Sequence, residues 1–313
     1  MIFLFISCSS DIKSIDSASP VVDQIGILRR EDGWLRGDLH IHSTYSDGYD
    51  DVITNINIAE YLANETFLSA HPEYTGNGLD FISLTDHRTV AQQSDLDYVS
   101  SELILINGEE FGDNGHAGVH GIQEMVEQDP GNDGTTLDDI LNAVISTREQ
   151  GGTFSPNHPF LPIIPFPWDI EDHDGIEIWN SGWALMSPEM TLEKLDEWEA
   201  ENGSASPTYK RAVQTTGQLA SMQALTWYEA RLSRGHHAAL IGGSDRHTVL
   251  PIGFPTTWIH TDSFDESGII KGIQERRSFV SRTPVSAQLK ITVDVNGNSY
   301  QMGDEIPLNT VST

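Results

Sequence analysis

Two histidines one residue apart, His40 and His42, are followed by Asp47 within the segment GDLHIHSTYSDG, residues 37–48. The residues before them, Trp34 to Leu39, have the composition of a short buried strand. Because side chains alternate along a strand, the two histidines point to the same face. A pair of imidazoles followed by a loop carboxylate is typical of a metal site, although paired histidines also occur as solvated surface residues.

Histidines and carboxylates also stand at the ends of other predicted strands farther along the chain. In a parallel (β/α) barrel the carboxyl ends of all strands meet at one face, where the site is built. Any one of these residues taken alone is more often a structural or surface residue than a metal ligand, but their shared position at strand ends predicts that they converge. They are His87 after ISLTD, Glu109 and Glu110 in INGEEF, His116 in NGHAG, His158 in SPNHP, and Asp245 and His247 in GSDRHT.

The strands and helices that must position these residues alternate along the chain. Apolar segments such as LDFISLT and AALIGG are predicted strands, and segments with helical periodicity, such as TTLDDILNAVISTREQ with Thr136 as its N-cap, lie between them. About seven such units predict parallel strands and a barrel rather than an open sheet. The predicted organisation is an N-terminal segment 1–30, a barrel domain 31–285 with a polar insertion at about 182–216, and a β-hairpin appendage 286–313 around the turn NGN.

The composition excludes some functions. The chain has 313 residues, of which 47 are acidic and 17 basic, so its formal net charge is −30. Such a field repels phosphate backbones and argues against nucleic acid as a partner. It attracts cations, although most of these carboxylates are expected to form an ordinary solvated surface.

The chain starts with the apolar run MIFLFIS, which ends at Cys8, the only cysteine. This pattern resembles a bacterial lipoprotein signal peptide, so we expect export to the cell envelope, with a lipid at Cys8 as the only link to a membrane. The run is shorter than the hydrophobic region of a normal signal peptide and no Lys or Arg precedes it, so the alternative is an ordinary apolar N-terminus with a free thiol. The Ser-rich residues after Cys8 predict a tether.

Taken in order, the motifs GDLHIHSTYSDG, TDH, GEEF, GH, NHP and GSDRH resemble those of the PHP superfamily, named for polymerase and histidinol phosphatase. The resemblance covers roughly residues 34–285, and its first and last motifs are the most specific. It implies an α/β fold, a distorted seven-stranded (β/α) barrel of the PHP type, to which the chain adds a small C-terminal β appendage. It also implies a hydrolase with two or three divalent metal ions, of manganese, zinc or iron.

The resemblance further implies a set of metal ligands. Glu110 is preferred to Glu109 because the family pattern has one residue between the glycine and the ligand. Asp47, Glu110 and His247 are in addition predicted to be catalytic. One metal ion would be bound by His40, His42, Glu110 and Asp245, a second by Glu110, His116 and His158, with Glu110 bridging, and a third by Asp47, His87 and His247.

The chemistry of these residue types agrees with that assignment. Imidazole and carboxylate together suit zinc, manganese or iron. A bridging carboxylate can hold two cations about 3.5 to 4 Å apart, which lowers the pKa of a shared water and makes hydroxide the expected nucleophile. Arg88 and Arg246, each next to a proposed ligand, are predicted to bind substrate oxygens, the alternative for each being a surface salt bridge. For Asp38 and Asp86 we expect structural roles.

Three functions remain open at this level. A small-molecule phosphoester is the favoured substrate, because Asp47 completes a third metal position that a carbonyl substrate needs less. The first motifs most resemble a branch that includes carbamate and amide hydrolases, so a carbamate, amide or ester substrate at a two-metal site is the alternative. A non-catalytic surface-binding lipoprotein is disfavoured, because adjacent metals sharing nine ligands must leave coordination positions open.

Overall fold

The computed structural model describes residues 21–22, 28–29, 32–61, 79–131, 134–170, 172–181, 189–216 and 219–306. Cys8 and almost all of the predicted segment 1–30 lie outside the described residues, as do residues 182–188 of the predicted insertion and the end of the appendage beyond residue 306. Export and lipid attachment therefore stay predictions. Among the helices of the described part, none is long and apolar enough to cross a membrane.

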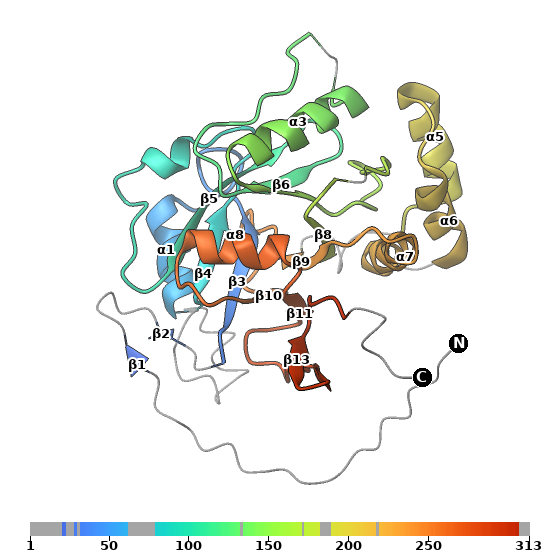
Figure 1. Cartoon of the computed structure of the whole chain (residues 1–313). Coiled ribbons are helices and arrows are strands. Elements are labelled where there is room, and N and C mark those ends of the chain that lie inside the picture. The colour runs from blue at the N-terminus through green and yellow to red at the C-terminus, as the bar shows by residue number, and fades with distance from the viewer. Residues whose placement is uncertain are drawn as a thin grey trace.

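The centre of the molecule is a curled mixed sheet of seven strands, with helices packed outside it (Figure 1). Three central strands, β3 to β5, are parallel, whereas β6 and β10 are antiparallel to both of their neighbours. Along the sheet the order is β11 (Ser278–Ser281), β10 (Thr256–His260), β3 (Trp34–Ile41), β4 (Phe81–Leu84), β5 (Ile104–Phe111), β6 (Ala117–His120) and β7 (Thr153–Pro156).

The expectation of parallel strands throughout is therefore wrong for β6 and β10. A parallel pair needs a crossover of a dozen or more residues, whereas only residues 112–116 connect β5 to β6. Such a short connection can only form an antiparallel pair. The regular alternation of strand and helix is lost at this point of the sheet.

A two-stranded parallel ribbon, β8 (Gly175–Asn180) and β9 (Ala239–Gly243), lies between the two ends of the curled sheet. On the β7 side, the backbone N–H of Asp174 donates to the carbonyl of Phe154 at 2.8 Å. On the β11 side, the backbone N–H of Leu240 donates to the hydroxyl of Ser278 at 2.8 Å. The ribbon thus connects both ends of the sheet and brings β9 beside β3.

The helix predicted in the segment TTLDDILNAVISTREQ forms as expected. The predicted cap of α3 (Leu137–Glu149) is confirmed: Thr136 Oγ1 accepts from the backbone N–H of Asp139 at 3.2 Å, and the Asp139 carboxylate accepts from the backbone N–H of Thr136 at 2.9 Å. Outside the sheet also lie α1 (Val52–Tyr61), the 3₁₀ turn η1 (Ala91–Ser94) and α8 (Glu266–Gln274).

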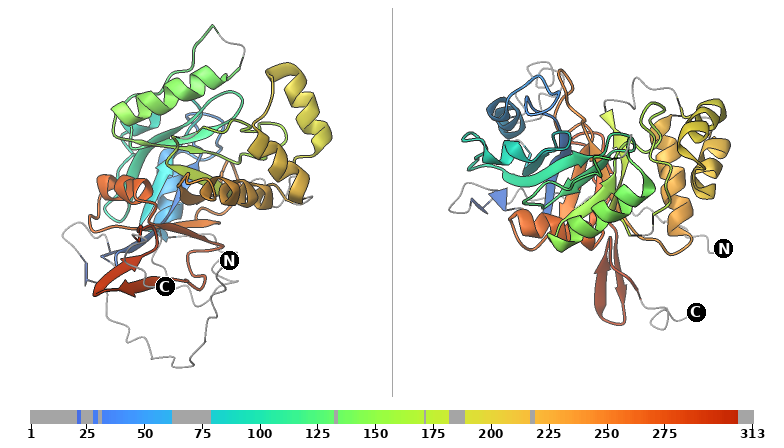
Figure 2. Two further views of the ribbon diagram at one scale, coloured as in Figure 1. Left: turned by 45° about the vertical axis from the view of Figure 1, so that its right-hand side comes forward. Right: turned by 90° about the horizontal axis from the view of Figure 1, so that it is seen from above.

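Three helices, α5 (Leu192–Asn202), α6 (Pro207–Thr216) and α7 (Ala220–Leu232), gather on one side of the molecule (Figures 1 and 2). In the polar insertion predicted at about 182–216 the sequence pattern indicates one helix, which is α5, and the structure adds a second, α6. The β12–β13 hairpin (Thr292–Val295 and Asn298–Gln301) is confirmed, with Asn296 and Gly297 at φ +51° and +82° in its turn. β1 (Val21–Val22) and β2 (Leu28–Arg29) form a further antiparallel pair.

The hydrophobic core that α6 and α7 cover contains packed aromatic rings. Phe160 and Tyr209 stack with ring centroids 4.1 Å apart and planes at 4°, and both pack against Trp227 in α7. All three side chains are fully buried. Burial of such side chains contributes roughly 1.5–3 kcal/mol each, so the loop that follows β7 is firmly held where His158 enters the site.

A buried histidine in the same core predicts a pH-dependent stability. His173 donates from Nδ1 to the carbonyl of Gly175 at 2.8 Å, and burial lowers its pKa from 6.5 to about 4. Between pH 6.5 and about 4 the unfolded chain binds a proton that the folded one does not, so stability is lost as the pH falls through this range. This group accounts for roughly 2 to 3 kcal/mol of that loss.

A His173→Gln variant should therefore lose less of its free energy of unfolding between pH 7 and pH 4.5 than the wild type does. Urea unfolding of both proteins at the two pH values, with chelator present throughout, measures the difference. An identical loss in both proteins would contradict the assignment to His173.

Candidate metal centre

All nine side chains predicted as metal ligands lie together at one edge of the curled sheet. The side chains at the ends of parallel strands lie there as expected, because the carboxyl ends of these strands meet at this edge. His116 arrives differently: β6 is antiparallel, so the residue preceding its first position, rather than one following its last, lies at this edge. The mixed sheet therefore gathers the same residues that a parallel barrel would gather.

Glu110 in β5 is the centre of this cluster. Its two carboxylate oxygens lie 3.1 to 3.4 Å from imidazole nitrogens of five histidines. Asn157 adds a hydrogen bond from its side-chain amide at 2.9 Å. A carboxylate shared in this way has the position expected of a bridging ligand. The five histidines are His40, His42, His87, His116 and His158.

The neighbouring carboxylate, Glu109, points to the opposite face of β5, as alternation along a strand requires. Its Oε1 accepts from the backbone N–H of Val126 at 2.6 Å, and burial raises its pKa to about 8. The structure thus shows which of the two adjacent glutamates can be a metal ligand, whereas the sequence distinguished them only by their spacing from the glycine. Glu109 anchors a loop, and Glu110 faces the cluster.

The possible ligand atoms fall into four overlapping groups, each with its atoms within 4.8 Å of one another. Glu110, His40, His42 and His87 each belong to two groups. Two of the sets implied by the resemblance differ here: Glu110 does not join the group of His40, His42 and Asp245, and His116 and His158 contact Glu110 in separate groups. The predicted third set is intact and is joined by His42. The groups are His42, Asp47, His87 and His247; His40, His42 and Asp245; His40, Glu110 and His158; and His87, Glu110 and His116.

The cluster has a buried and an open side. The side chains of His40 and Glu110 are 1% exposed, whereas those of Asp47 and His247 are 59% and 31% exposed. Asp47 lies 3.1 Å from His247 and 3.5 Å from His87. The group containing Asp47 therefore forms the mouth of the site, and the other three groups form its floor.

The buried nitrogen and oxygen atoms of the cluster are better suited to coordinating divalent cations than to hydrogen-bonding with one another. The Nε2 atoms of His40 and His42 and Nδ1 of His116 make no regular hydrogen bond within the described residues, although each lies 3.1 to 3.4 Å from a carboxylate oxygen. Buried imidazole lone pairs beside carboxylates would repel each other without positive charge between them. Cations coordinated by both kinds of ligand supply that charge.

The charge balance of the site points the same way. Burial alone would lower the pKa of His40, but the carboxylates of Asp245, Glu110 and Glu177 outweigh it and raise this pKa well above its ordinary value. Burial alone would raise the pKa of Glu110, but His116 and His40 hold it well below its ordinary value. The floor of the site therefore stabilises positive charge strongly.

Three residues of the site have unusual backbone conformations. His158, Arg88 and Asp245 have φ angles of +27°, +49° and +51°, in a region that non-glycine residues rarely adopt. Such conformations typically cost 1–3 kcal/mol each and persist where the surroundings enforce them, often at functional sites. Here they turn two cluster side chains inward directly after β7 and β9.

The two arginines predicted to bind substrate differ in their surroundings. Arg88 is about half exposed and forms an ion pair with Asp113. Arg246 is buried, pairs with Asp50 and donates to the carbonyl of Leu250. Arg88 can exchange its partner for a substrate at little cost, whereas Arg246 already has structural partners. Substrate binding by either arginine stays a prediction.

Sequence reasoning missed the polar residues of β8. Glu177, 1% exposed, contacts His40, and Asn180 donates to both Glu177 and Asp245. The available signal was a carboxylate inside the apolar strand GIEIWN. Among the histidines left outside the ligand set, His120 is buried and bonds from Nε2 to the carbonyl of Leu39 at 2.9 Å.

Comparisons with known proteins find only distant similarity. No family model matches the chain, and no curated protein matches it. Among solved structures, a two-domain protein from Bacteroides vulgatus, described as containing a predicted PHP-like metal-dependent phosphoesterase, has 19% identity and a TM-score of 0.46. The match covers 80% of this chain and 65% of that one, so the chain spans less than two thirds of its length.

Two further solved structures are similar at the same level. PsfC from Pseudomonas syringae has 14% identity over 80% of this chain and 93% of its own, with a TM-score of 0.46. A lesion-specific endonuclease from Pyrococcus furiosus has 13% identity over 77% of this chain and 56% of its own, with a TM-score of 0.40.

Proposed function

We propose that the protein is a metal-dependent hydrolase of the PHP superfamily and that its substrate is a small phosphoester. The observation that carries this proposal is the convergence of six histidines and three carboxylates on one site, with Glu110 shared among its groups. Two or three divalent cations bound there supply Lewis acidity and lower the pKa of water. A barrel of the PHP type, with the β8–β9 ribbon closing the curled sheet, is part of the same proposal.

The residues on the floor of the site and those at its mouth have different proposed roles. On the floor, Glu110 and Asp245 place negative charge among buried imidazoles, and with them would hold the cations. At the mouth, Asp47 and His247 lie 3.1 Å apart and are both accessible to solvent. With no cation at the mouth, they would be placed to orient the attacking water and to exchange a proton with the leaving group; with a third cation there, they would be its ligands.

A groove of about 570 Å³ beside the cluster gives room for the rest of a substrate. It is lined by His87, by the ion pair of Arg88 and Asp113, and by residues 125–130. This volume is in the range of small-molecule sites. With a net charge of −30, it supports a small substrate rather than a nucleic acid.

Metal content and hydrolysis test the proposal together. Protein purified without chelator should contain two or three equivalents of manganese, zinc or iron by elemental analysis. It should hydrolyse members of a panel of phosphomonoesters and phosphodiesters, lose this activity with chelator and regain it with added metal. Protein that binds no metal and hydrolyses nothing after reconstitution would contradict the proposal.

A carbamate or amide hydrolase is the second candidate, because the mouth of the site is exposed while the floor alone has enough possible ligands for two metal ions. An Asp47→Ala variant distinguishes the two. If the mouth holds a third cation that binds a phosphoryl oxygen, we expect a loss of at least about a hundredfold in kcat/KM, or roughly 3 kcal/mol in the barrier. Activity on carbamates or amides that survives Asp47→Ala would favour the second candidate.

A further inference from the structure

We infer that Glu177 is a positioning residue of the metal centre and sets the tautomer of His40. Its Oε1 lies 3.0 Å from His40 Nδ1, on the side of the ring away from the cluster. A carboxylate can only accept there, so Nδ1 carries the proton. Nε2, which lies 3.1 Å from Glu110 and 3.3 Å from Asp245, then presents its lone pair to a cation.

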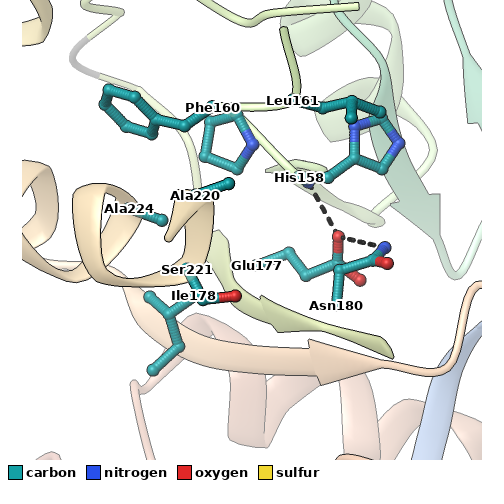
Figure 3. Close-up of a pocket in the computed structure, with 10 residues that line it drawn as sticks. His158, Phe160, Leu161, Glu177, Ile178, Asn180, Ala220, Ser221 and Ala224 are labelled. Carbon is teal, nitrogen blue, oxygen red and sulfur yellow. Dashed lines mark hydrogen bonds between the residues drawn. The ribbon is translucent and has the colours of Figure 1, made fainter. Parts of the chain in front are cut away.

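The same carboxylate also holds two other ligand-bearing segments. Its Oε2 accepts from the backbone N–H of His158 at 2.7 Å and from the side-chain amide of Asn180 at 3.0 Å (Figure 3). That amide also donates to Asp245 at 3.2 Å. Glu177 therefore connects, directly or through one residue, ligands that follow or end three separate strands.

Two local features place Glu177 at this point. A register irregularity between Glu177 and Trp179 interrupts the pairing of β8 with β9, and such bulges re-aim side chains. Gly243 in β9 leaves the space: a Cβ there would lie 2.4 Å from the Cβ of His40 and 2.6 Å from Glu177 Oε1. Any larger residue at position 243 would push His40 and Glu177 apart.

The contacts of Glu177 reach only the floor of the site. His40, His158 and Asp245 belong to the two buried groups around His40, whereas the mouth group has no contact with Glu177 among the bonds described. Glu177 should therefore control metal affinity on the floor and leave the mouth nearly unaffected. This inference rests on the proposed function only in requiring that the cluster binds metal ions.

The test measures zinc binding by titration calorimetry after bound metal has been removed with chelator. It compares the Glu177→Gln variant with the wild type. A glutamine that keeps its oxygen toward His158 and Asn180 turns its NH₂ toward His40 Nδ1. The ring must then carry its proton on Nε2 and cannot ligate. We expect the floor sites to weaken roughly 10- to 100-fold, and the mouth site to change by less than about threefold.

Asp174→Asn is the matched control, because Asp174 directly precedes β8 and accepts from the backbone N–H of Phe154 at 3.0 Å without touching the cluster. Floor affinities that stay unchanged in Glu177→Gln, or that fall equally in Asp174→Asn, would overturn the inference. A wild type that binds no zinc would instead refute the proposed function.

A second measurement does not depend on the variant folding. In the zinc-loaded wild type, ¹⁵N NMR of the histidine rings should show His40 protonated at Nδ1 with slow exchange of that proton. A His40 ring protonated at Nε2 would overturn the inference even if Glu177→Gln cannot be purified.

Discussion

A Glu110→Gln variant should lose activity by about a thousandfold or more in kcat/KM, corresponding to roughly 4 kcal/mol in the barrier, and should retain fewer metal ions per chain. Glutamine has nearly the same shape but no charge, and only one of its two terminal atoms can ligate a cation. Its NH₂ group would stand 3.1 to 3.4 Å from imidazole nitrogens that need a shared anion. Kinetics and elemental analysis on the same preparation measure both effects.

Glu109→Gln is the control for this experiment, because the two residues are adjacent, identical in type and buried on opposite faces of β5. Glu109 accepts one backbone hydrogen bond, which a glutamine oxygen can also accept. We expect its variant to keep metal content and kcat/KM within about threefold of the wild type. Equal losses in both variants would show that the effect comes from the strand and not from a metal ligand.

The strand-end positions of the histidines could be predicted from sequence because each follows a short apolar segment whose direction is easily read. His40, His87 and Asp245 need only the rule that strand ends meet at one edge of a sheet. The antiparallel direction of β6 could not be predicted by counting alternating elements, since it depends on the short connection before it. His116 nevertheless reaches the site, because either end of a strand can lie at that edge.

The roles of Glu177 and Asn180 could not be predicted from the sequence for a different reason. Their function depends on β8 lying beside β9 and on the space left by Gly243, and neither is a property of the segment GIEIWN itself. Local sequence shows which residues can bind a cation. The partners that orient those residues follow from contacts between strands far apart in the chain.

Replacement of the buried Asp38 should cost much stability. Its carboxylate, fully buried, accepts three backbone N–H groups: those of His40 and Ser244 at Oδ1, both at 3.1 Å, and that of Gly253 at Oδ2, at 2.8 Å. These bonds tie the end of β3 to the segment after β9 and to the loop before β10. An Asp38→Asn variant must place an NH₂ group against at least one of these N–H donors.

We expect this variant to lose roughly 3 kcal/mol of unfolding free energy, because a buried donor is left unpaired and a second donor faces it. Thermal and urea unfolding with chelator present measure the loss without a contribution from bound metal. Asp86→Asn is the matched comparison. Asp86 is equally buried but accepts from the hydroxyls of Ser43 and Ser46, at 2.7 Å each, and from only one backbone N–H, that of Ser43, also at 2.7 Å.

A hydroxyl can rotate and accept from an asparagine NH₂, whereas a backbone N–H cannot change its role. The Asp86→Asn variant should therefore lose only about 1 kcal/mol. If both variants lose the same stability, burial of the charge and not the identity of the donors determines the cost. If Asp38→Asn alone is strongly destabilised and also binds less metal, the backbone at the ends of β3 and β9 is what places His40 and Asp245 within reach of the same cation.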